Sequence, residues 1–78
     1  MDHIEIKMSS TGDGMKWIKL KKWFFNDNEM INKGDIIAEV ETDLAILEIE
    51  AFANGKLEIK KQEEEAIDVG DLICNIKF

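Results

Sequence analysis

The pattern at 29–40 recurs at 65–76, and this internal repeat limits most strongly what the chain can fold into. In each copy a Glu and an Ile precede a Gly-Asp pair, and an apolar run follows the pair. Gly34 of the first copy recurs as Gly70, 36 residues later in a chain of 78. A unit this small buries its apolar face only against its neighbour. The repeat therefore predicts a single domain, 1–78, made of two similar halves with pseudo-twofold symmetry.

Between the turns, apolar residues recur mostly at every second position, which is the period of a strand with one buried face. The stretches with this alternation are 4–8, 18–21, 47–50 and 56–60. Gly, Asn and Asp, which favour turns, gather between the apolar stretches at 12–14, 26–28, 33–35, 54–55 and 69–71. Six to eight short strands predict an all-β fold, either a small sandwich or a flattened barrel.

Composition excludes several classes of protein. The net charge of −7 argues against a nucleic-acid or anionic-membrane surface, because phosphate binding needs clustered Lys and Arg. Acidity favours solubility and basic protein partners instead. No apolar run is long enough to span a membrane, and the start at Met1 lacks the pattern of a signal peptide. We expect a soluble monomer without disulfide or metal, since Cys74 is the only cysteine.

Candidate catalytic residues do not form a constellation. His3 stands alone near the terminus, and Cys74 lies within an apolar strand, so we expect a surface histidine and a buried thiol. The run 63–65 of three Glu residues is expected to be a solvated turn. The aromatic residues are expected to be mostly core: Trp17, Trp23, Phe24 and Phe25. The chain is therefore predicted to be non-catalytic.

The segment Glu41–Glu50 connects the two halves, and it therefore has no counterpart within the repeat. Within it, strand-like residues bracket 41–45, which predicts a tight hairpin with Asp43 and Leu44 at its tip. The Asp43 carboxylate suits a turn because it can accept hydrogen bonds from the next backbone amides. A lone exposed Leu is ordinary on a soluble protein and needs no functional reason by itself.

The residues 34–45, which read Gly-Asp-Ile-Ile-Ala-Glu-Val-Glu-Thr-Asp-Leu-Ala, closely resemble the lipoyl domains of 2-oxo acid dehydrogenase acyltransferases. The hairpin of those domains reads Glu-Thr-Asp-Lys-Ala. The resemblance extends over nearly the whole chain, because Gly12-Asp13-Gly14 is similar to a family Gly-Glu-Gly loop and 22–24 to the strand after it. Coverage of this extent is far more specific than one short motif.

The resemblance implies a barrel-sandwich hybrid, a flattened barrel of two four-stranded antiparallel sheets with the modified lysine on a protruding hairpin. In the family this lysine carries lipoamide, which takes an acyl group from a thiamine-dependent 2-oxo acid decarboxylase and is reoxidised by dihydrolipoamide dehydrogenase. A lipoate ligase or lipoyl transferase attaches the cofactor. The carrier itself does no bond chemistry; the cofactor and the partner enzymes do.

This chain departs from the family at the decisive position, because the lysine maps onto Leu44, which has no amine to acylate. Its neighbours Asp43 and Ala45 still match. We expect a lipoyl-type carrier domain that cannot be lipoylated and holds no cofactor, through an engineered or isolated substitution. The resemblance implies that partners are recognised by Glu41, Thr42 and Asp43 together with the loop Gly12, Asp13 and Gly14.

Two alternatives stay open. A natural, unmodified interaction or spacer module would use Leu44 to dock into an apolar groove. A biotinyl carrier shares the fold, but its hairpin should read Met-Lys-Met, and 42–45 does not. The Gly-Asp-Gly loop at 12–14 favours the 2-oxoglutarate or branched-chain type of complex. The chain is expected to be a segment of a longer acyltransferase, located in bacterial cytoplasm or mitochondrial matrix.

Overall fold

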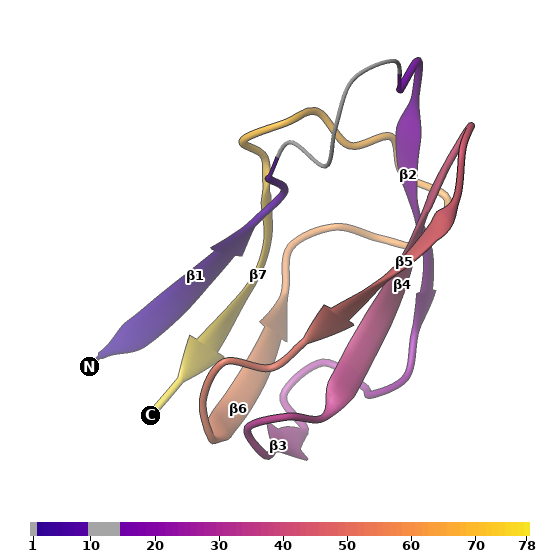
Figure 1. Ribbon diagram of the computed structural model, residues 1–78. Helices are drawn as coiled ribbons and strands as arrows, with labels where there is room; N and C mark the ends of the chain where they lie inside the picture. The colour runs from indigo at the N-terminus through magenta and orange to yellow at the C-terminus, as the bar shows by residue number, and fades with distance from the viewer. Residues whose placement is uncertain (1, 10–14) are drawn as a thin grey trace.

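A computed structural model describes residues 2–9 and 15–78, which form seven strands in two antiparallel sheets. The strands are β1 (His3–Lys7), β2 (Ile18–Trp23), β3 (Met30–Ile31), β4 (Ile36–Thr42), β5 (Ile46–Glu50), β6 (Gly55–Ile59) and β7 (Leu72–Lys77). One sheet has the order β1-β7-β6-β3 and the other β2-β4-β5, and they pack face to face (Figure 1). Within the described residues no helix is long and apolar enough to cross a membrane. The predicted all-β sandwich is confirmed.

The second sheet differs from the expected four strands, since its fourth member is reduced to one isolated bridge. Ala66 pairs with Lys19 at the outer edge of β2, and the Ile67 amide donates to the Ile18 carbonyl at 2.8 Å. Glu64, just before this bridge, has a φ of 71°, a left-handed conformation that does not continue a strand. The counterpart in the other half, β3, is also only two residues long. Both end members are thus short.

The two copies of the sequence repeat have the same backbone conformation and the same turn hydrogen bond. Gly34 and Gly70 have φ values of 94° and 93°, a conformation that side chains rarely adopt. In the turn that contains each glycine the same bond forms 36 residues apart: Asp35 N donates to Asn32 O, and Asp71 N to Asp68 O, both at 3.0 Å. The two halves therefore have the same local backbone, as the repeat predicts.

The core consists of two clusters, and each half of the chain contributes to both. One cluster is Ile6, Ile31, Ile37, Ala51, Leu57, Cys74 and Ile76. The other is Met8, Ile18, Leu20, Ala38, Val40, Ile67 and Ile73. Ile37 lies in the first cluster and its repeat counterpart Ile73 in the second. Because repeat partners go to opposite clusters, neither half can complete a core by itself.

The expectation that the four aromatic residues are mostly core is wrong for two of them. Trp23 and Phe25 pack against the core, but Trp17 and Phe24 are 46% and 44% exposed. Ile18 and Leu20 point inward, so alternation along β2 turns Trp17 outward. The alternation of side chains along the strand, and not the hydrophobicity of the residue, therefore determines that Trp17 is exposed.

The β4–β5 hairpin projects at the end of the molecule opposite to the C-terminus (Figure 1). The molecule is elongated, with principal extents of 37 × 19 × 19 Å. Phe78 N donates to Asp2 O at 3.1 Å, so the ends of the described chain lie side by side. The hairpin thus lies at the far end of the molecule from both ends of the described chain.

Gly55 is needed for space and not for a turn, in contrast to its expected role. It begins β6, and a Cβ at this position would overlap the Lys77 carbonyl oxygen and the Ile76 side chain of β7. Overpacking of this kind costs about 1–3 kcal/mol. We therefore predict that Gly55→Ala lowers the free energy of unfolding by that amount in urea titrations. Lys56→Ala, at the exposed next position, should change it by less than about 0.5 kcal/mol; equal effects would contradict this close approach.

Candidate functional site: the β4–β5 hairpin

The buried Thr42 hydroxyl organises the hairpin that joins the two halves. Its Oγ1 accepts hydrogen bonds from the amides of Leu44 at 3.0 Å and Ala45 at 2.9 Å, and donates to the Ala45 carbonyl at 3.1 Å. Thr42 N also donates to that carbonyl at 2.8 Å. One donor and two acceptor sites are the full capacity of a hydroxyl. The turn is therefore held by its first residue, which is 6% exposed.

Asp43 makes a long-range bond where a local one was expected. Its Oδ1 accepts from the amide of Lys16 at 2.9 Å, across 27 positions of sequence. The amides of the turn use Thr42 instead, so the prediction that Asp43 accepts from the following backbone amides is wrong. Asp43 ties the hairpin to the segment that enters β2, which fixes the direction in which the hairpin projects.

Leu44 occupies the tip, as predicted. The residue is 65% exposed, and Ala45 beside it is exposed as well. The Leu44 amide is held by Thr42, so the backbone is anchored while the side chain projects into solvent. The side chain at this position is presented to solvent, and in leucine it consists of four carbon atoms without a polar group.

The carboxylates near the hairpin are largely engaged within the chain. Glu41 lies 3.6 Å from the ammonium of Lys19, which also pairs with Glu64 at 2.8 Å. The hydrogen bond with Glu64, followed by its charge, raises the pKa of Lys19. Glu39 stands opposite Glu48 in the strand register. Of the acidic residues expected to attract a partner, Glu41 and Asp43 thus already have structural contacts.

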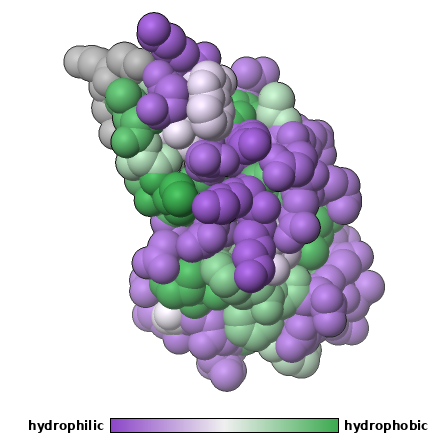
Figure 2. Space-filling view, turned by 90° about the vertical axis from the view of Figure 1, so that its right-hand side faces the viewer, coloured by the Kyte–Doolittle hydropathy of each residue, from purple (hydrophilic) through white to green (hydrophobic). Residues whose placement is uncertain are grey.

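Exposed apolar side chains accompany Leu44 at this end of the sheet. Trp17 precedes β2, and Ile46, the first residue of β5, is 49% exposed. Figure 2 shows the side that faces right in Figure 1 as a mixture of hydrophilic and hydrophobic areas, with hydrophobic surface near its upper end and also in its lower half. Sequence reasoning did not single out Ile46 or place Trp17 on the surface, although strand alternation carried the signal for Trp17.

The described residues offer no nucleophile or metal centre at the hairpin. No group of three or more His, Cys, Asp or Glu among them could hold a metal ion. Burial raises the pKa of the Cys74 thiol to about 12, so it is not a thiolate at neutral pH. His3 is exposed on β1, as expected, and the run 63–65 is an exposed turn. The described part of the hairpin presents the side chain of Leu44 to solvent.

The predicted recognition residues are brought together only in part. Glu41, Thr42, Asp43, Leu44 and Ala45 lie together on the hairpin, as their spacing requires. The other predicted residues, Gly12, Asp13 and Gly14, lie outside the described residues.

Comparison with known proteins gives consistent matches. The biotin/lipoyl family, described as "Biotin-requiring enzyme", matches residues 4–76. The chain is 36% identical over 70 residues to a dihydrolipoyllysine-residue acetyltransferase component of pyruvate dehydrogenase complex from Bacillus subtilis, covering 88% of this chain. It is 36% identical over 73 residues to the same component from Zymomonas mobilis, covering 91%. It is 39% identical over 54 residues to a pyruvate dehydrogenase E1 component subunit beta from Rhizobium meliloti, covering 69%. The chain spans 12–17% of the length of these relatives.

Removing the Thr42 hydroxyl should loosen the turn. We predict that Thr42→Val, which keeps the shape, lowers the free energy of unfolding by about 1–3 kcal/mol, because the amides of Leu44 and Ala45 lose their acceptor. The Leu44 and Ala45 amides should also exchange with solvent much faster in NMR measurements. Thr42→Ser keeps the hydroxyl and should leave these two amides protected; fast exchange in the serine variant would show that the hydroxyl does not hold the turn.

Proposed function

This chain belongs to the biotin/lipoyl domain family, and from that premise we propose that it is a lipoyl-type carrier domain silenced at its attachment position, Leu44. A domain of this family is a carrier and is not catalytic by itself. Its similarity to the acyltransferase components of pyruvate dehydrogenase complexes supports the lipoyl branch of the family over the biotinyl branch. The sequence at 42–45, Thr-Asp-Leu-Ala, also lacks the Met-Lys-Met of biotinyl carriers.

The observation that carries the proposal is the position of Leu44 at the tip of an otherwise ordered hairpin. Thr42 and Asp43 hold the turn and its direction, and Leu44 is 65% exposed at the place where an arm would be attached. Attachment of lipoate needs an amine, and the leucine side chain has none. The residues present therefore do not fit covalently bound lipoate, and no acyl-transfer step is assigned to this chain.

The partners follow from the same reasoning. We propose that three kinds of enzyme recognise the hairpin: a lipoate ligase or lipoyl transferase, a thiamine-dependent 2-oxo acid decarboxylase and dihydrolipoamide dehydrogenase. The relatives from Bacillus and Rhizobium are named as pyruvate dehydrogenase components. Their names favour a pyruvate-type complex over the 2-oxoglutarate or branched-chain type suggested by residues 12–14. Bacterial cytoplasm or mitochondrial matrix stays a prediction for the compartment.

Intact mass after incubation with lipoate ligase, lipoate and ATP tests the proposal. We expect no mass change for this chain and the addition of one lipoyl group to Leu44→Lys, with peptide mapping placing the group at position 44. Leu44→Arg is the matched control, because it adds a positive charge without an amine that the ligase can acylate. Lipoylation of the unaltered chain, at Lys16 for example, would contradict silencing, and an unmodified Leu44→Lys variant would show that the hairpin is not a ligase substrate.

The exposed setting of Leu44 makes a second prediction. Leu44→Lys should change the free energy of unfolding by no more than about 0.5 kcal/mol, as expected for an exposed position. Chemical denaturation of both proteins measures this difference. A large loss would place Leu44 in the core and remove the basis for its alignment with the lysine.

A second candidate function, an unmodified interaction module, is favoured by the apolar residues around the tip. Trp17 and Ile46 are each about half exposed near Leu44, and a partner with an apolar groove would cover them. The two functions are separated by titrating a 2-oxo acid decarboxylase with the unaltered chain and with the Leu44→Lys variant, neither of them lipoylated. If the chain is a silenced carrier, the decarboxylase should bind the chain and the variant with similar weak affinity. If it is a dedicated interaction module, the variant should lose binding because position 44 becomes charged.

A further inference from the structure

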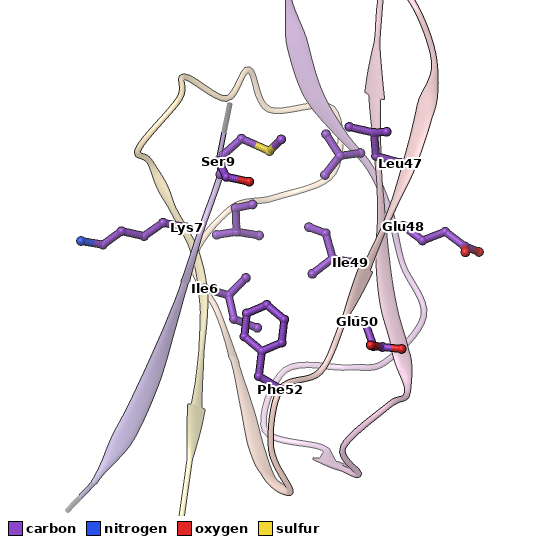
Figure 3. A pocket seen from close by; sticks show the side chains of 11 residues that line it. Ile6, Lys7, Ser9, Leu47, Glu48, Ile49, Glu50 and Phe52 are labelled. Atoms are coloured by element: carbon purple, nitrogen blue, oxygen red, sulfur yellow. The ribbon is translucent and has the colours of Figure 1, made fainter. Parts of the chain in front are cut away.

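A cleft opens on the side of the sandwich between β1 and β5, away from the hairpin tip. Its volume is about 250 Å³. Apolar side chains from both sheets line most of it: Ile6, Met8, Val40, Leu47, Ile49, Phe52 and Ile73. Figure 3 shows Ile49 directed into the space between the two strands, with Ile6 and Phe52 facing it. Neither Asp43 nor Leu44 is among the lining residues, so this feature is separate from the proposed attachment position.

The cleft is flanked by two strand edges that have no partner strand in the described residues. β1 pairs only with β7, and β5 pairs only with β4. An edge strand of an antiparallel sheet leaves the backbone N–H and C=O of alternate residues free to pair with another strand. Both edges meet a register shift of the inner strand beside the cleft, β1 between Ile6 and Lys7 and β5 between Ile49 and Glu50. Charge is therefore what distinguishes β5 from β1 as the edge that receives a strand.

The side chains of β5 alternate in burial along the cleft. Leu47 and Ile49 are half-buried in it, while Glu48 and Glu50 border it and are exposed. Figure 3 shows Glu48 pointing away from the cleft. A strand added to this edge would have the same alternation, with every second side chain entering the cleft and the others lying beside the glutamates.

Charge determines which strand fits. In the described part of the chain, Glu48 and Glu50 form no ion pair, whereas Lys7 on the opposite wall is 3.6 Å from Glu5. Glu39 lies opposite Glu48 and adds another carboxylate to this surface. A second copy of the chain, with its own net charge of −7, would bring glutamates against glutamates. The occupant is therefore cationic and is not another copy.

We infer that the β5 edge and its cleft bind an extended peptide in which apolar residues alternate with Lys or Arg. The peptide backbone pairs with the free edge of β5, its apolar side chains fill the cleft against Ile49 and Phe52, and its cations lie beside Glu48 and Glu50. This binding does not depend on position 44 or on lipoylation. It gives the domain a second docking surface on the side of the sandwich.

A short synthetic peptide with alternating valine and lysine tests the inference by fluorescence anisotropy and by NMR of the backbone amides. We expect saturable binding, with the largest amide shifts at 46–50 and at 6–8. A peptide of the same composition, with its valines consecutive, should bind at least about tenfold more weakly. Equal affinity for the two peptides, shifts elsewhere or no binding would overturn the inference.

Two pairs of variants separate the contributions to binding. Phe52→Ala should weaken binding by about tenfold, the effect of removing an aromatic anchor, while Phe78→Ala should not change it. The two phenylalanines are 60% and 57% exposed, so both variants are expected to fold. Glu48→Lys should weaken binding more than Glu48→Gln does. Equal affinity of the two phenylalanine variants, or no effect of either change at Glu48, would contradict the proposed site.

Strand pairing and self-association have their own controls. In a bound strand, the amides of alternate residues face β5 and the remaining amides face away from it. N-methylation of the amides that face β5 should abolish binding because it removes the donors to β5. N-methylation of the amides that face away should preserve binding. Sedimentation of the chain without peptide should show a monomer. A concentration-dependent dimer that is lost in Phe52→Ala would identify a second copy as the occupant and overturn the inference.

Discussion

The mutual burial of two incomplete halves is the constraint on which the structure depends. Repeat partners such as Ile37 and Ile73 lie in different core clusters, so each half supplies side chains to both clusters. Burial of apolar surface is the main favourable contribution to folding, and in a chain of 78 residues without a disulfide no covalent link supplements it. The fold therefore forms as a unit. Gly55, which lets β6 and β7 approach closely, belongs to this constraint because a larger residue would separate strands that carry both clusters.

The same constraint explains why the hairpin is available for function. β4 and β5 are held by the core, but the connection at 43–45 lies beyond it and is kept in shape by polar bonds from Thr42 and Asp43. A turn fixed in this way projects one side chain without contributing to the core. We therefore expect the fold to tolerate replacement of the residue at its tip.

The sandwich leaves β1 and β5 as edge strands, each without a partner on one side in the described residues. Two stacked sheets that do not close into a barrel have edges, and edges are usually protected by charge, irregularity or short length. Here both edges meet a register shift of the inner strand, and β5 also carries Glu48 and Glu50. In the binding mode inferred above, these charges oppose the approach of an identical acidic chain and attract a cationic strand.

The sequence by itself determined the strand positions, the twofold repeat and the hairpin with Leu44 at its tip, because alternation and turn residues are local properties of the chain. Burial of Cys74 and exposure of His3 followed from the same patterns. Only the tertiary structure decided that Asp43 bonds to Lys16, that Gly55 is a point of close approach and that β5 borders an apolar cleft. Each of these joins residues distant in sequence, and their meeting depends on how two sheets pack, which no local pattern encodes.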